Sequence, residues 1–97
     1  MKVATWRGGT EITIDEVPAP KAGPSELVMK VLSSGICGTD IHKTQGLFPA
    51  TPPDILGHEF VGPVIEVGEG VDESMIGKVI GCTLNPACGE CQGCLTW

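Results

Sequence analysis

Three cysteines near the end of the chain are spaced as metal ligands. Cys88, Cys91 and Cys94 form a C-x2-C-x2-C pattern with glycines between them. Thiolates bind Zn²⁺, and structural zinc sites are almost always four-coordinate. The fourth ligand is either Cys82 or a residue beyond the 97 given, and we favour the second because Cys82 falls in a predicted strand. A disulfide or free-thiol loop is the alternative, and iron–sulfur clusters use similar spacing.

A second set of metal-type side chains is dispersed over two segments. Cys37 follows a strongly apolar predicted strand, and His58 and Glu59 lie one loop further along the chain. Cysteine, histidine and carboxylate together match catalytic zinc, which has three protein ligands and one open position. Asp40 lies where it could hold the other ring nitrogen of a ligating histidine. A single cysteine is most often a buried apolar residue and a single histidine a surface residue without a metal, so only the combination indicates a site.

Short strands are expected to position these residues. Residues 11–15 alternate strictly between polar and apolar side chains, and Gly8-Gly9 separates them from the apolar residues 2–6, which predicts a hairpin. Further strands are expected at residues 26–34, 60–67 and 78–84, and one helical turn at 39–44.

Turn-forming residues dominate the rest of the chain. The 14 glycines and 8 prolines make up nearly a quarter of the 97 residues, and no long helical period occurs. Gly62 and Pro63 inside the strand at 60–67 predict a bulge or a sheet edge. Residues 85–97 are expected to form a loop. The pattern favours a single mainly β, barrel-like domain with functional loops.

Charge and hydropathy exclude several classes of partner. The net charge is −6, with 6 basic and 12 acidic residues and no basic cluster, so nucleic-acid binding is not expected. No apolar run approaches the ~18 residues of a membrane span. The N-terminus lacks an apolar signal core, so we expect a cytoplasmic protein. In that reducing compartment, clustered cysteines are expected to be metal ligands rather than disulfides.

Three motifs together resemble one family. The segments GICGTDIH at 35–42, PDILGHEFVG at 53–62 and the cysteine loop at 88–94 are similar to those of the zinc-dependent medium-chain alcohol dehydrogenases, in the same order. The resemblance covers residues 1–97 as the N-terminal GroES-like catalytic domain. It implies a mainly β, partly open GroES-like barrel with a zinc-binding loop, incomplete at the C-terminus and without a nucleotide-binding domain.

The resemblance implies a metal role for most of the residues named above. Cys37 and His58 would ligate the catalytic zinc, Glu59 would approach or ligate it during ligand exchange, and Asp40 would support His58. The cysteines of the loop would be three of the four ligands of a structural zinc: Cys88, Cys91 and Cys94.

The resemblance also implies a reaction. Thr39 would accept the proton of an alcohol or polyol substrate, and His42 would relay that proton to solvent. Zinc would stabilise the alkoxide, which then transfers hydride to NAD or NADP. A full-length form is expected to be a homo-oligomer.

Several features of the family pattern are missing from these 97 residues. The third catalytic ligand and the fourth structural thiolate of the family fall beyond the 97 residues, and no G-x-G-x-x-G motif is present, because the Gly68-Glu69-Gly70 segment continues to Glu73. We therefore expect the 97 residues alone to lack dehydrogenase activity. The alternatives are a stand-alone zinc-binding GroES-like module without catalysis and a chaperonin-like cap that shares only the barrel.

Overall fold

The chain folds as short strands joined by turns and a few helical turns. A computed structural model describes residues 1–82 and 88–96. Within these residues the strands are β1 (Lys2–Gly8), β2 (Glu11–Glu16), β3 (Leu27–Met29), β4 (Ser33–Ser34), β5 (Asp54–Ile55), β6 (Phe60–Val67) and β7 (Val79–Gly81). The helical elements are α1 (Gly38–Thr44), the 3-10 turn η1 (Glu73–Met75) and α2 (Gln92–Leu95).

The first sheet has the order β2-β1-β5 and confirms the predicted hairpin. The turn forms at Gly8 and Gly9, which both have positive φ, and the Trp6 indole Nε1 donates to the Gly9 carbonyl at 2.8 Å. The burial is the reverse of what the alternation suggests, because Ile12 and Ile14 are 50% and 69% exposed.

On β2, the polar side of the hairpin is the less exposed one. Arg7 donates to Asp15 Oδ2 at 2.5 Å and to the Thr13 hydroxyl at 3.1 Å, so the charged groups on this face satisfy one another. The isoleucines lie on the opposite, concave face, which nothing within the described residues fully covers. The strand is therefore confirmed, while its apolar face stays open.

The second sheet is built around β6, which pairs with β3, β4 and β7. The single strand predicted at 26–34 is instead divided into β3 and β4. A Cβ at Gly62 would lie 1.8 Å from the Lys30 carbonyl oxygen, so the backbones of Gly62 and Lys30 are in direct contact there. Pro63 has no N–H to donate, and Lys30 N donates to its carbonyl at 2.9 Å. The prediction of a bulge or an edge at Gly62-Pro63 needs correction: β6 has partners on both sides, and its register shift with β3 lies between Val28 and Met29, opposite Glu66 and Val64.

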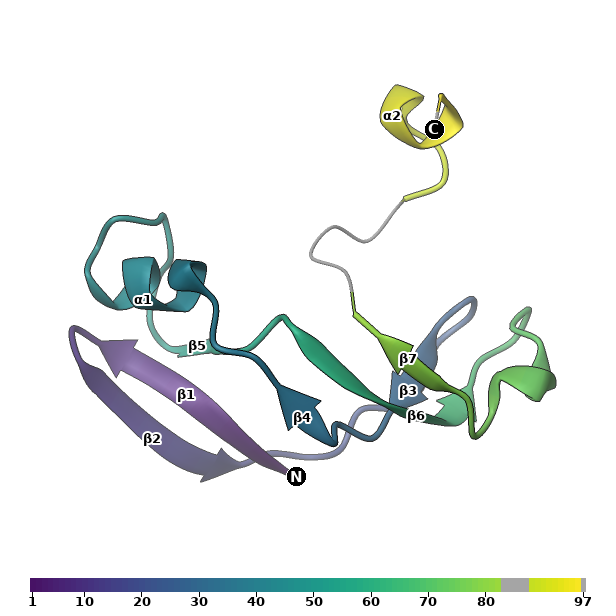
Figure 1. The fold of residues 1–97 in the computed structure, drawn as a ribbon, viewed down its shortest axis with the longest axis horizontal. Helices are drawn as coiled ribbons and strands as arrows, with labels where there is room; N and C mark the ends of the chain where they lie inside the picture. The colour runs from purple at the N-terminus through teal and green to yellow at the C-terminus, as the bar shows by residue number, and fades with distance from the viewer. Residues whose placement is uncertain (83–87, 97) are drawn as a thin grey trace.

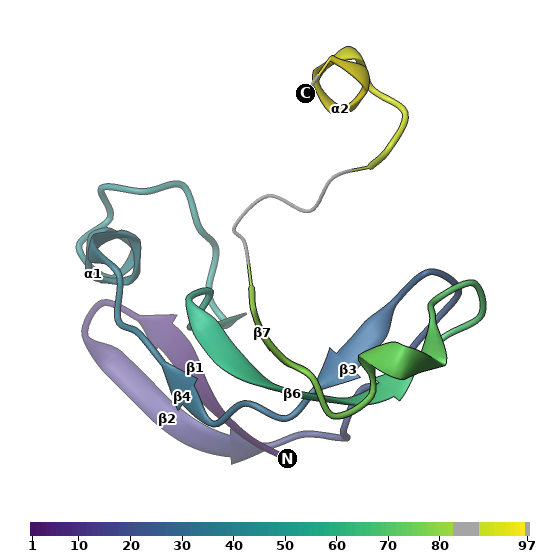
Figure 2. The same ribbon diagram turned by 45° about the vertical axis from the view of Figure 1, so that its right-hand side comes forward.

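The two sheets form an open, curved half-barrel (Figures 1 and 2). The radius of gyration is 15.4 Å, against ~13 Å for a compact domain of this length. Among the described residues, the buried apolar core contains only Trp6 and Val64. A hollow of about 940 Å³ lies between the sheets, lined by residues of β1, β3, β6 and β7. The predicted mainly β, partly open barrel is confirmed.

Three local predictions need correction. The strand expected at 78–84 is β7, which ends at Gly81, and positions 83 and 84 lie outside the described residues. The turn η1 was not predicted; the Asp72 side chain caps it by accepting from Ser74 N at 2.8 Å. The segment expected to be a loop at 85–97 contains the single-turn helix α2, which stands away from both sheets in Figures 1 and 2.

Within the described residues, no helix has the length and apolar character needed to span a bilayer.

Candidate metal centres

The β4–β6 ladder brings the first two motifs together. Ser34 pairs with Phe60, and Gly35 N donates to the Glu59 carbonyl at 2.6 Å. The chain then enters α1, whose N-terminal cap is Cys37 with extended backbone angles. Asp40, in the first turn, accepts a hydrogen bond from Cys37 N through Oδ2 at 3.0 Å. This hydrogen bond fixes the orientation of the Cys37 backbone at the start of the helix.

Cys37, His58 and Glu59 form one cluster, although the sequence separates them. Their candidate ligand atoms all lie within 4.8 Å of one another. Two ligands at about 2.0–2.3 Å from one zinc ion lie at most about 4.6 Å apart, so the cluster is close to ligand spacing. Cys37 and His58 are half-buried, while Glu59 is exposed. The arrangement therefore has an inner Cys–His pair with a carboxylate at its open side.

The imidazole of His58 is arranged as a metal ligand would be. Its Nδ1 lies 3.4 Å from Asp40 Oδ1, and its Nε2 is buried without a hydrogen-bond partner. A buried, unpartnered ring nitrogen costs free energy unless something binds it. A zinc ion between His58 Nε2 and the Cys37 thiolate would satisfy that nitrogen, so the residues fit the metal that the sequence implies.

The electrostatics of the pair favour a charged thiolate. The Thr39 backbone N–H, its hydroxyl and His58 lower the pKa of Cys37. Interaction with the Cys37 thiol, followed by the charge of Asp40, raises the pKa of His58. The pKa of Cys37 is lowered mainly because Thr39 hydrogen-bonds to the thiolate, and that of His58 is raised because anionic groups lie beside it. A bound Zn²⁺ would take the place of the imidazolium as the partner of the thiolate.

The two residues expected to transfer the substrate proton lie on α1. Thr39 is half-buried, and its hydroxyl is 3.6 Å from Cys37 Sγ. His42 is exposed and follows three positions later, which places the two side chains on neighbouring parts of one helix face. Within the described residues, no hydrogen bond joins them. The structure thus brings Thr39 to the cluster and leaves His42 at the solvent side.

The cysteine loop forms a second cluster. The sulfurs of Cys91 and Cys94 are 3.5 Å apart, and those of Cys88 and Cys94 are 3.8 Å apart. The backbone N–H groups of Glu90 and Cys91 lower the pKa of Cys88 to about 7, because both point at its sulfur. Such N–H···S contacts are suited to a metal-bound thiolate. Cys82 belongs to neither cluster, and its backbone N–H donates to the Phe60 carbonyl at 3.0 Å.

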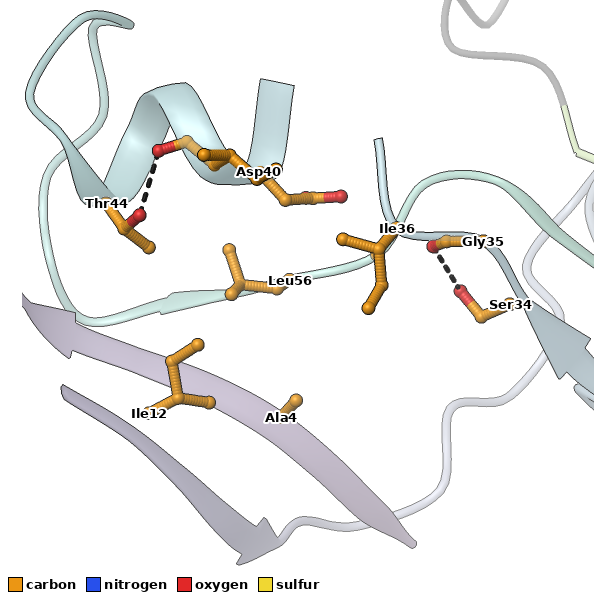
Figure 3. A pocket seen from close by; sticks show the side chains of 10 residues that line it. Ala4, Ile12, Ser34, Gly35, Ile36, Asp40, Thr44 and Leu56 are labelled. Atoms are coloured by element: carbon orange, nitrogen blue, oxygen red, sulfur yellow. Dashed lines mark hydrogen bonds between the residues drawn. The ribbon is translucent and has the colours of Figure 1, made fainter. Parts of the chain in front are cut away.

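A mainly apolar pocket lies between α1 and the β1–β2 hairpin (Figure 3). Its volume is about 330 Å³. Ile12 lies on the hairpin side of this space, and Ile36 and Leu56 reach into it from the segments on either side of α1. Asp40 lines it from α1, so the pocket reaches the residue that contacts His58. The packing beneath α1 is therefore loose.

Sequence reasoning missed one contact near the first cluster. Lys43 Nζ lies 2.7 Å from Asp54 Oδ2 and joins α1 to β5. Nothing in the sequence pattern signals this ion pair, because its members lie on two elements whose packing only the fold establishes.

Comparison with known proteins identifies the family. Residues 23–96 match the family described as the alcohol dehydrogenase GroES-like domain. Because the match covers most of the chain, the protein belongs to this family. Its motifs and open β fold are those of the N-terminal domain of zinc-type alcohol and polyol dehydrogenases.

Two curated relatives are dehydrogenases of hydroxyl-bearing compounds. The chain is 42% identical over 83 residues to L-threonine 3-dehydrogenase of Thermococcus kodakarensis, covering 81% of this chain and 24% of the relative. It is 39% identical over 93 residues to sorbitol dehydrogenase of Halalkalibacterium halodurans, covering 95% and 27%. The chain thus spans about a quarter of the length of the curated relatives it matches.

A solved structure shares the fold. The acetophenone reductase of Geotrichum candidum NBRC 4597, determined in complex with NAD, superposes with a TM-score of 0.88 at 35% identity. The match covers 98% of this chain and 29% of the reductase.

Proposed function

We propose that this chain is the metal-binding part of the catalytic domain of a zinc-dependent alcohol or polyol dehydrogenase. One observation carries the proposal: His58 Nε2 is buried without a partner and faces a cysteine and a carboxylate at ligand spacing. The names of the relatives support hydroxyl compounds as the substrate class.

Each residue of the first cluster has a distinct task in this proposal. Cys37 and His58 would hold the zinc, and Glu59, on the exposed side, would be available as a further ligand. Asp40 orients His58 through Nδ1 so that Nε2 points at the metal. Bound zinc supplies Lewis-acid polarisation of the substrate oxygen.

The proton of the substrate hydroxyl leaves along α1. Thr39 lies beside Cys37, so its hydroxyl accepts the proton at the site and donates its own onward. His42, exposed one turn later, passes the proton to solvent. This path carries a proton through side chains and keeps bulk water away from the reacting carbon.

The remaining features belong to the whole protein. Cys88, Cys91 and Cys94 hold a structural zinc at the tip of the cysteine loop. NAD or NADP would be the hydride acceptor in the whole protein, a proposal that the NAD complex of the similar reductase supports. We further propose that the whole protein is cytoplasmic, because thiols stay reduced in that compartment, and that it is a homo-oligomer, as the resemblance to the family implies.

Zinc counting tests the proposal. The purified chain is expected to bind two zinc ions, and Cys37→Ser and Cys91→Ser are each expected to lose one, measured by elemental mass spectrometry after gel filtration. The 97 residues alone are expected to show no NAD(P)-dependent alcohol oxidation. A zinc content that Cys37→Ser leaves unchanged would rule out the catalytic-metal assignment, and turnover by the chain alone would refute the second expectation.

A further inference from the structure

The two ligand segments of the first cluster belong to one long excursion from the second sheet. The chain leaves at Ser34 and returns at Phe60, where β4 and β6 pair. This ladder fixes where the excursion begins and ends. It does not fix α1, which begins after Cys37 and runs away from the sheet. A second attachment is needed to hold the far end of the helix.

The packing beneath α1 does not provide that attachment. The pocket of about 330 Å³ separates the helix from the β1–β2 hairpin (Figure 3). Ile41, on the helix, lines this pocket and is 50% exposed. A helix that packs loosely on its apolar face depends more strongly on its polar contacts for its position.

The Lys43–Asp54 ion pair attaches α1 to β5 instead. Lys43 lies in the last turn of α1, and its ammonium is 2.7 Å from Asp54 Oδ2. The two side chains are only 18% and 36% exposed, so water screens them less than a typical surface pair.

Asp54 is itself rigidly placed. It pairs with Trp6 in the first sheet, and two positions later Leu56 N donates to the Ala4 carbonyl at 3.0 Å. The ion pair therefore ties the helix that starts at Cys37 to the strand that leads to His58. Within the described residues, the Asp40–His58 contact is the only other charged side-chain contact between α1 and this segment.

We propose that Lys43 and Asp54 form a positioning pair that sets the separation of the Cys37 and His58 ligands. The inference rests on the proposed function, because it assumes a metal at these ligands. Neither side chain touches the metal. The pair acts on affinity by keeping the apo site at ligand spacing, so that little reorganisation accompanies binding.

Cobalt titration of the purified chain tests this. Co²⁺ bound to thiolate gives a charge-transfer absorption band, and the component absent from Cys37→Ser reports this site alone. We expect Lys43→Met and Asp54→Asn each to weaken that component about tenfold, as substitutions of outer partners of metal ligands do. The double variant is expected to lose no more than either single one, and the charge swap of Lys43→Asp with Asp54→Lys to recover part of the loss.

The Arg7–Asp15 pair provides a matched control. It has similar geometry at 2.5 Å but joins β1 and β2 on the face away from the cluster. Arg7→Met is expected to leave cobalt affinity unchanged, even where it lowers the melting temperature measured with chelator. Equal weakening by Arg7→Met, or unchanged affinity in Lys43→Met, overturns the inference.

Two further outcomes are decisive. If Lys43→Met does not fold, judged by circular dichroism, unchanged affinity in Asp54→Asn still overturns the positioning role, and a tenfold loss there still supports it. If Cys37→Ser binds Co²⁺ as the parent does, the metal centre itself is absent, and the proposed function fails together with this inference. The two failures are thus distinguished by the Cys37→Ser reference.

Discussion

At the scale of single residues, the candidate catalytic centre leaves two buried polar atoms without a hydrogen bond, Asp40 Oδ1 and His58 Nε2. Asp40 accepts from the Cys37 backbone and contacts His58 Nδ1, so the carboxylate holds both ligands at once. The consequence is that His58 Nε2 is directed into a buried position without a partner. Most buried polar atoms in proteins are paired, which makes this atom the strongest indication of a bound metal.

The two histidines of the chain provide a direct test. His58→Ala is expected to weaken zinc binding at the first cluster by more than about 100-fold, since it removes a ligand rather than an outer partner of one. His42→Ala is expected to leave affinity unchanged, because His42 is exposed on α1. Competition with a chromophoric chelator measures both. Equal affinities for the two variants would contradict the assignment of His58.

Asp15 predicts a pH dependence of stability. The Thr5 hydroxyl and, to a smaller extent, Thr13 and Arg7 lower the pKa of Asp15 below its usual 3.8. A lowered pKa in the folded state contributes stability above the unfolded value, and this contribution is lost as the pH falls through the folded value. The melting temperature of Asp15→Asn should therefore lie below that of the parent at about pH 6 and approach it below about pH 4.

Thr5→Val checks the cause of this shift. It removes the hydroxyl that lowers the Asp15 pKa most, so it is expected to reduce the gap between the chain and its Asp15→Asn derivative. A gap that stays constant from about pH 6 to pH 3 would show that Asp15 acts without titration.

At the scale of elements, one backbone crossing in the second sheet shapes the site. The contact between Gly62 and Lys30 divides β3 from β4. Because β4 pairs with β6 at Ser34 and Phe60, this division determines where the excursion that carries the ligands begins. The position of Cys37 thus depends on the close contact between Gly62 and Lys30.

Gly62→Ala is expected to be strongly destabilising. Its Cβ would lie 1.8 Å from a backbone oxygen that cannot rotate away, so strands must separate, at a cost of about 3 kcal/mol or more. Gly81→Ala, in the neighbouring strand β7, is the matched control because no atom lies within 4 Å of its Cβ position. Thermal unfolding measures both, and a shift for Gly62→Ala no larger than that for Gly81→Ala would refute the argument.

At the scale of the whole molecule, the half-barrel leaves much apolar surface exposed. Large apolar side chains on both sheets and beside them are open to solvent: Ile12, Ile14, Leu32, Val61, Ile65 and Val79. Contiguous exposed apolar surface is typical of interfaces or of aggregation-prone chains. In this structure it follows from a buried core that, in the described residues, contains only two apolar side chains.

The purified 10.1 kDa chain is therefore expected to self-associate and to bind a hydrophobic dye. Light scattering during gel filtration measures the mass, and the double variant with Ile12→Thr and Ile14→Thr is expected to reduce both association and dye fluorescence. A monodisperse monomer of the parent chain without dye binding would contradict the prediction.

Local sequence signals predicted much of the fold. Gly8-Gly9 predicted the hairpin turn, and the apolar run at 60–67 coincides with β6 because strand formation there follows from side-chain type. Prediction failed where distant backbone decides the outcome. The division of residues 26–34 follows from the crossing at Gly62, and no property of residues 30–32 themselves reveals it.

The sequence by itself determined the chemical inventory: two sets of metal-type side chains, a threonine and a histidine that we propose transfer a proton, and the family motifs that contain them. Residue type and short spacing suffice for these because ligand chemistry is a property of side chains. Only the tertiary structure decided that His58 Nε2 is buried and unpaired, that Lys43 reaches Asp54, and that the apolar face of β2 is open. These facts depend on contacts between segments distant in the chain, which spacing along the chain does not encode.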